Sequence, residues 1–167
     1  MKAFYILLFT FLFPQVGHTV IPGEYNPIVI KAPFSLSERV FDLTPAIQKA
    51  QAENKNLFIR LGGMDCPPCR EYDLFLYQNR SSLKEDFSKV IVIDIQTWIQ
   101  GPRIFLIVNG EKIPLNEFKQ RIGDKNTALF YPTFWYLNGN LQQIRQAPRG
   151  NTEFLSIEKH RHFLRSE

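Results

Sequence analysis

Cys66 and Cys69 are the only two cysteines among the 167 residues of this chain, and two prolines are all that separates them. Two thiols at this spacing can close a disulfide within one helical turn. Such a pair admits three kinds of chemistry: a structural cross-link, half of a metal site, or a reactive dithiol. The rest of the sequence has to favour one of them.

A purely structural cross-link at this position would add little to the stability of the domain. In the chain-entropy model, closing a loop of four residues contributes roughly 2 kcal/mol, less than a longer loop would give. The composition is that of an ordinary soluble domain, with 44% hydrophobic and 22% charged residues. A chain of this length buries enough core to fold as one domain without such a staple.

A metal site is the second possibility, and it needs about four ligands. Beyond the two cysteines, the candidates are His160 and His162, because the third histidine lies at position 18. Residues two apart on a helix point in different directions. The run 159–162 therefore reads more simply as a solvated helix face, and a copper or zinc carrier built on the cysteine pair stays an alternative.

The reactive dithiol has the most support from its neighbours. Pro67 and Pro68 fit a helix only in its first turn, where backbone N–H groups lack partners, so Cys66 belongs at the N-terminal edge. Helix dipoles and unpaired N–H groups lower the pKa of a thiol there. We expect an exposed Cys66 to attack a partner sulfur, and a buried Cys69 to resolve the mixed disulfide.

The elements that would position this pair alternate between helix and strand. We expect, in order, an edge strand near 28–30, a helix from Thr44, a strand at 57–61, the helix after Cys66, a helix opened by a capping box at 82–85, a strand at 90–95, a hairpin at 104–113, a helix at 116–122, a hairpin at 133–144 and a terminal helix from 151 or 152. This order contains a βαβ unit, which indicates an α/β fold.

This order of elements resembles the thioredoxin superfamily over residues 38–165. The motifs that carry the resemblance are Cys66-Pro67-Pro68-Cys69 opening a helix after a strand, and Tyr131-Pro132-Thr133 before a hairpin. It implies a thioredoxin fold, a central mixed sheet flanked by helices, here with an N-terminal extension and a hairpin insertion. It also implies that Pro132 is cis beside the disulfide and that the backbone of Tyr131 pairs with a substrate chain.

Four residues near the pair are candidates for tuning the thiol pKa. Asp65 replaces the tryptophan that precedes the first cysteine in thioredoxin, and Arg60 replaces its buried acid. Arg60 either pairs with Asp94 on the next strand, because a lone buried charge is costly, or reaches the surface. Arg60 and Arg70 would stabilise a thiolate, and Asp65 would oppose them.

The direction of electron flow follows from how well the thiolate is stabilised. Neither proline can donate an N–H to the sulfur of Cys66, which leaves chiefly the backbone of Cys69. Moderate stabilisation favours a reductase or isomerase, with a disulfide oxidase as the alternative. We expect no cofactor beyond the redox-active Cys66–Cys69 disulfide, and no bound metal.

The N-terminus predicts where the protein works. Lys2 precedes an apolar run at 3–13, which is typical of a secretory signal peptide and shorter than a membrane span. We expect a signal peptide at 1–19, an extended lead-in at 20–37 and the thioredoxin-like domain at 38–167. The mature protein would be periplasmic or secreted, where disulfides persist. Its partners would then be disulfide-containing client proteins and a membrane thiol donor, whereas a net charge of +4 gives no sign of nucleic-acid binding.

Overall fold

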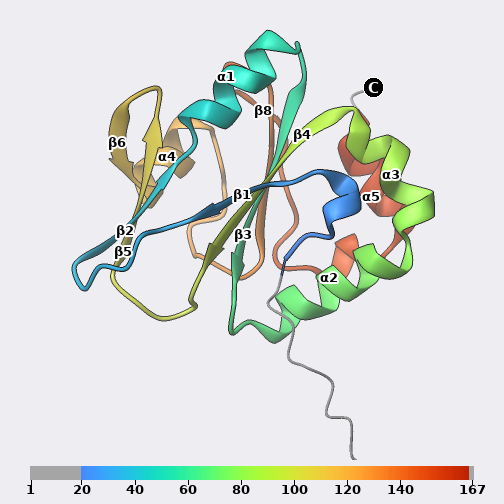
Figure 1. The fold of residues 1–167 in the computed structure, drawn as a ribbon, viewed down its shortest axis with the longest axis horizontal. Coiled ribbons are helices and arrows are strands. Elements are labelled where there is room, and N and C mark those ends of the chain that lie inside the picture. The colour runs from blue at the N-terminus through green and yellow to red at the C-terminus, as the bar shows by residue number, and fades with distance from the viewer. Residues whose placement is uncertain (1–19, 166–167) are drawn as a thin grey trace, which may run out of the picture.

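The computed structural model describes residues 20–165, so the expected signal peptide lies outside the described residues. Two sheets and five α-helices make up this part of the chain (Figure 1). In chain order the elements are η1 (Gly23–Tyr25), β1 (Ile28–Lys31), β2 (Glu38–Asp42), α1 (Thr44–Ala52), β3 (Asn56–Gly63), α2 (Pro67–Gln78), α3 (Arg80–Ser88), β4 (Val90–Thr97), β5 (Arg103–Val108), β6 (Glu111–Pro114), α4 (Leu115–Arg121), β7 (Thr133–Leu137), β8 (Gln143–Arg145), η2 (Thr152–Phe154) and α5 (Ile157–Leu164).

The larger sheet is mixed and has the strand order β1-β4-β3-β7-β8. Strands β1, β4 and β3 run parallel, and β7 runs antiparallel to both β3 and β8. The central strands β3 and β4 are buried almost throughout, because their long apolar runs are covered on both faces. The expected edge strand near 28–30 forms as β1.

Alternation along β3 divides the core into two layers. Leu57, Ile59 and Leu61 face a cluster shared with α1, α4 and the second sheet. Phe58 faces the opposite cluster, which α2, α3 and α5 cover. Figure 1 shows the same division, with α1 on one side of the larger sheet and α2, α3 and α5 on the other.

The smaller sheet has the order β2-β5-β6. Its β5–β6 hairpin is the expected one, and Asn109 and Gly110 take the positive φ angles of 50° and 84° that its two-residue turn requires. The pairing of β2 parallel to β5 was not expected from the sequence. It attaches the segment after the lead-in to the hairpin, so the hairpin is one part of a three-stranded sheet.

Several expected helix starts were wrong. Helix α3 begins at Arg80 directly after α2, so the predicted capping box at 82–85 lies inside it. Helix α4 begins at Leu115, one residue before the expected cap at Asn116. The terminal helix starts only at Ile157, where the Ser156 side chain accepts a hydrogen bond from the backbone of Lys159. The local signals predicted that these helices exist, and it is their first residues that differ.

The second hairpin also departs from its predicted turn. Leu141 takes a positive φ of 62°, and the pairing of β7 with β8 shifts register between Tyr136 and Leu137. The Asn138 carboxamide accepts hydrogen bonds from the backbone of Asn140 and Gln142, which stabilises a longer turn. Among residues 20–165 the helices are too short to cross a bilayer.

Candidate active site

A disulfide joins Cys66 and Cys69 at the start of α2, with their Cα atoms 5.2 Å apart. Cys66 is the N-cap residue in an extended conformation, and Pro67 and Pro68 occupy the first two helical positions. The missing N–H groups of these prolines cost nothing in the first turn. The predicted position of the pair at a helix N-terminus is therefore confirmed.

Backbone N–H groups donate to both sulfurs. The N–H of Cys69 donates to Sγ of Cys66 over 3.1 Å, and the N–H of Gly63 donates to Sγ of Cys69 over 3.4 Å. The first is the donor expected from the sequence. Hydrogen bonds of this kind favour the charged form of a thiol once the disulfide opens.

The expectation that Cys66 is exposed was wrong. Cys66 is 1% exposed and Cys69 is fully buried. A Cβ atom added to Gly63 would lie 3.0 Å from both Cβ of Cys66 and Cγ1 of Ile99, so Ile99 lies against the turn that carries Cys66. Asp65 holds this arrangement, because its Oδ1 accepts a hydrogen bond of 2.9 Å from the backbone of Ile99.

Arg60 pairs with Asp94, and its alternative position at the surface is wrong. The guanidinium is fully buried, and its Nε and Nη2 lie 2.8 Å and 2.7 Å from Oδ1 of Asp94. The other oxygen of Asp94 accepts hydrogen bonds from the backbone of Ile21 at 3.1 Å and from Gln96 at 3.0 Å. Asp73 of α2 forms a second ion pair with Arg60.

One buried guanidinium thus faces two carboxylates, one from the neighbouring strand β4 and one from α2. Burial alone would lower the pKa of Arg60, but the charges of Asp94 and Asp73 outweigh it and raise that pKa. Burial also raises the pKa of Asp73 to about 6, although the Arg60 charge works in the opposite direction. The cluster carries a net negative charge when both acids are ionised, so Arg60 offers no uncompensated positive charge to the sulfurs.

The peptide bond between Tyr131 and Pro132 is cis, as the resemblance implies. It lies just before β7, whose first residue, Thr133, pairs with Leu61 of β3. The register therefore brings this bond to the end of β3, next to the glycines that lead into residues 64–66, here called the cysteine turn. Burial raises the pKa of Tyr131, and the positive charge of Arg39 opposes that rise.

The remaining predicted residues lie outside this arrangement. Arg70 is exposed on the first turn of α2. His160 is fully buried, so the prediction of a solvated face at 159–162 was wrong for it. The hydroxyl of Tyr72 lies 2.7 Å from Nε2 of His160, and burial lowers the pKa of this histidine to about 3. Among residues 20–165 no three His, Cys, Asp or Glu side chains gather closely enough to hold a metal ion.

Sequence reasoning missed two residues of the site. Asp73 follows Cys69 by four positions, and this spacing places both on one face of a helix, which was a usable signal. No sequence signal pointed to Arg39, because its hydrogen bonds reach residues 58 to 63 positions further along the chain.

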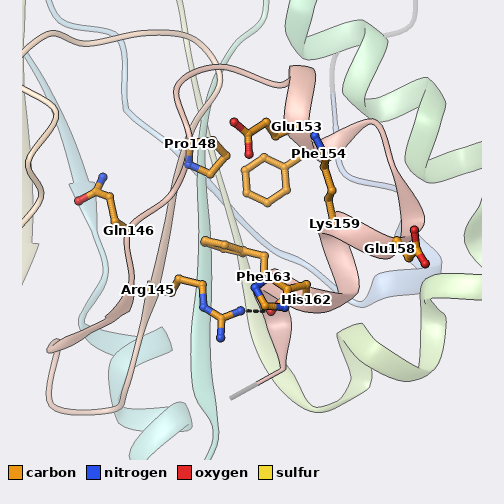
Figure 2. A pocket seen from close by; sticks show the side chains of 9 residues that line it. All are labelled: Arg145, Gln146, Pro148, Glu153, Phe154, Glu158, Lys159, His162 and Phe163. Atoms are coloured by element: carbon orange, nitrogen blue, oxygen red, sulfur yellow. Dashed lines mark hydrogen bonds between the residues drawn. The ribbon is translucent and has the colours of Figure 1, made fainter. Parts of the chain in front are cut away.

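A hollow of about 420 Å³ lies between β8 and α5, and no residue of the cysteine turn lines it. Figure 2 shows Phe154 and Phe163 in its wall and Arg145 donating a hydrogen bond to the backbone oxygen of His162. Both rings belong to the core cluster under α2. The hollow is therefore separate from the candidate redox chemistry.

No protein-family model matches this chain, and no curated protein matches it closely enough to count as a relative. The α/β fold and the close cysteine pair fit a redox function.

Proposed function

We propose that the chain is an exported thiol–disulfide oxidoreductase of the thioredoxin type that reduces or isomerises disulfides in client proteins. The observation that carries this proposal is the disulfide at the N-cap of α2 beside a cis X–Pro bond. The strand order of the larger sheet supports the thioredoxin fold, because β7 pairs antiparallel to β3 and its start therefore lies at the end of β3 that leads into the cysteine turn.

The proposed reaction consists of two thiol–disulfide exchanges. The Cys66 thiolate attacks one client sulfur, forms a mixed disulfide and releases the other client sulfur as a thiolate, which takes up a proton. The Cys69 thiolate then attacks Sγ of Cys66 and releases the second client thiol. The client gains two electrons and two protons, and the protein ends as the Cys66–Cys69 disulfide. In isomerisation the released client thiolate attacks a second disulfide of the client instead, and the thiolate freed there attacks the client sulfur of the mixed disulfide, which returns Cys66 as the thiolate.

The surroundings of the pair support reduction over oxidation. A strong oxidant needs a heavily stabilised thiolate in its reduced form. Here Cys66 has one close backbone donor, and the positive charge of Arg60 is matched by two carboxylates. Moderate stabilisation of the thiolate leaves the disulfide as the favoured state, so the dithiol form gives up its electrons readily.

A reductase outside the cytosol needs its own source of electrons. We propose a membrane thiol donor that reduces the Cys66–Cys69 disulfide by the reverse exchange and is itself oxidised to a disulfide. This donor and the periplasmic or secreted location both rest on the predicted signal peptide at 1–19.

Trapping of the mixed disulfide tests the proposal. The full-length chain carrying Cys69→Ala, incubated with a disulfide-bonded peptide, should accumulate a covalent adduct at Cys66 that mass spectrometry resolves. The matched variant Cys66→Ala should accumulate none at equal concentration. Absence of the adduct in both variants would exclude the oxidoreductase. Stoichiometric copper or zinc in the wild-type protein, lost in either variant, would favour the metal carrier.

A further inference from the structure

The connection from β4 to β5 forms a strap, residues 98–102, that Arg39 of β2 holds in place. Arg39 donates to Oγ1 of Thr97 at 2.8 Å, to the Trp98 carbonyl at 2.6 Å and to the Pro102 carbonyl at 2.8 Å. Gly101 has a φ of 147°, and a Cβ there would lie 3.3 Å from Cζ of Arg39. The backbone of the strap thus closes tightly around one guanidinium.

The strap also lies against the turn that carries Cys66. Ile99 lies against the cysteine turn, the backbone N–H of Ile99 is bound by Asp65, and Cys66 is left 1% exposed. A client cystine held rigidly in a folded surface cannot approach a cysteine that is only 1% exposed. A flexible client segment can displace the Ile99 side chain and reach Cys66.

The strap also lines a hollow of about 380 Å³, here called the side hollow. Its apolar wall comes from the lead-in, β2, the cysteine turn and the strap: Ala32, Phe34, Leu36, Phe41, Met64 and Trp98. Phe34, Leu36 and Trp98 are 93%, 88% and 52% exposed. Figure 1 shows the β1–β2 connection, the β4–β5 connection and the β3–α2 turn along the lower edge of the view.

Large apolar side chains gathered beside one site mark an interaction surface. We propose that the side hollow binds an apolar side chain of an unfolded client segment, close to the half-cystine that Cys66 attacks. This inference rests on the proposed function and names its substrate class. Trp98 and Met64 line the hollow, whereas Ile99 and Cys66 are their near neighbours in the strap and the cysteine turn. A segment lying across the strap therefore meets the hollow and the sulfur together.

The charged residues of the hollow refine the choice of client. Among the described residues, Lys31 and Arg39 line the hollow and no acidic residue does. Arg39 is already engaged with the strap, whereas Lys31 is exposed. A client segment with an apolar residue near its cysteine and a carboxylate beyond it matches this lining.

The test compares two disulfide-bonded peptides that differ at a single position, two residues away from the cysteine. One peptide has leucine at that position and the other has serine. The dithiol form of the full-length chain should reduce the leucine peptide about tenfold faster. The double variant Phe34→Ser/Leu36→Ser should lose this preference, and its rate with hydroxyethyl disulfide should stay within about twofold of wild type. The matched control Leu74→Ser/Tyr77→Ser removes two exposed apolar side chains from α2 and should keep the preference.

Equal rates with both peptides in the wild type, or equal loss of preference in the control, would overturn the inference. A binding readout separates it from the proposed function. Redox-inert peptides with serine in place of cysteine should shift the indole N–H signal of Trp98 in NMR spectra only when they carry leucine; the other tryptophan, Trp135, is buried. Failure of the dithiol form to reduce hydroxyethyl disulfide would overturn the proposed function. Failure of the leucine peptide to shift the Trp98 signal would overturn client binding at the side hollow.

Discussion

Replacing Asp73 by asparagine should make the protein more stable at neutral pH. Arg60 carries one positive charge and faces the carboxylates of Asp73 and Asp94 in a buried cluster. Asp94 accepts hydrogen bonds from the backbone of Ile21 and from Gln96 as well, so it is well compensated. Asp73 carries the surplus charge, and the carboxamide of the variant would keep an oxygen for Arg60 without that charge.

The size of the effect follows from the pKa. The pKa of Asp73 rises from its ordinary value of 3.8 to about 6, so between these values the folded state binds more protons than the unfolded state. Stability is therefore lost as the pH rises from 3.8 to 6, by about 3 kcal/mol at most, since each pKa unit is worth about 1.4 kcal/mol. This net shift already includes the charge and the hydrogen bond of Arg60, so the neutral carboxamide of the variant should avoid nearly the whole loss.

Urea unfolding of the oxidised protein measures the difference. The Asp73→Asn variant should exceed wild type by about 2–3 kcal/mol at pH 7 and by less than about 1 kcal/mol at pH 4. The control Asp94→Asn removes a fully compensated partner of Arg60 and should cost about 3–5 kcal/mol at pH 7. A gain in stability that does not change with pH, or a loss of stability at pH 7 in Asp73→Asn, would refute the claim that Asp73 carries a surplus charge.

Three further outcomes follow from the same contacts. Gly63→Ala should cost about 1–3 kcal/mol in urea unfolding, because its Cβ would crowd Cys66 and Ile99; an unchanged midpoint would contradict this. Arg39→Gln should release the strap and raise the alkylation rate of Cys66 in the dithiol form severalfold, whereas Lys31→Gln should leave it unchanged. His160 has a folded pKa of about 3 against an ordinary 6.5, so the unfolded state binds more protons between these values and stability falls on acidification. This loss should be measured by urea unfolding of the Asp73→Asn variant, because the titration of Asp73 in wild type changes stability in the opposite direction. The free energy of unfolding should fall on acidification by at most about 1.4 kcal/mol per pH unit, and a flat profile would argue against the buried neutral His160.

The sequence was sufficient for those parts of the site that local chemistry dictates. Two prolines allow only one placement of Cys66, at the N-cap of a helix. An apolar run with a single arginine left two alternatives for Arg60, pairing with Asp94 of the next strand or a position at the surface, and the structure shows the pair. The cis bond before Pro132 came from the resemblance alone, since X–Pro bonds are cis in only about 5% of cases.

The sequence was insufficient wherever distant segments meet. The strap beside the cysteine turn is held by hydrogen bonds of Arg39, which join residues about 60 positions apart. His160 lies between two basic neighbours, and only the packing of α5 on α2 and α3 decides that it faces inward, toward Tyr72. No periodicity within one short helix carries that information.

Alkylation of the dithiol form tests the central claim, a reactive Cys66 thiol at a helix N-terminus, most directly. Iodoacetamide should modify Cys66 alone, with Cys69 untouched, and the rate should rise with a midpoint below the pH of about 8.5 that is usual for a free cysteine. Mass spectrometry of peptides from the folded protein assigns the site. Two sulfurs that both stay unmodified until the protein unfolds, or modification of Cys69 before Cys66, would contradict the account.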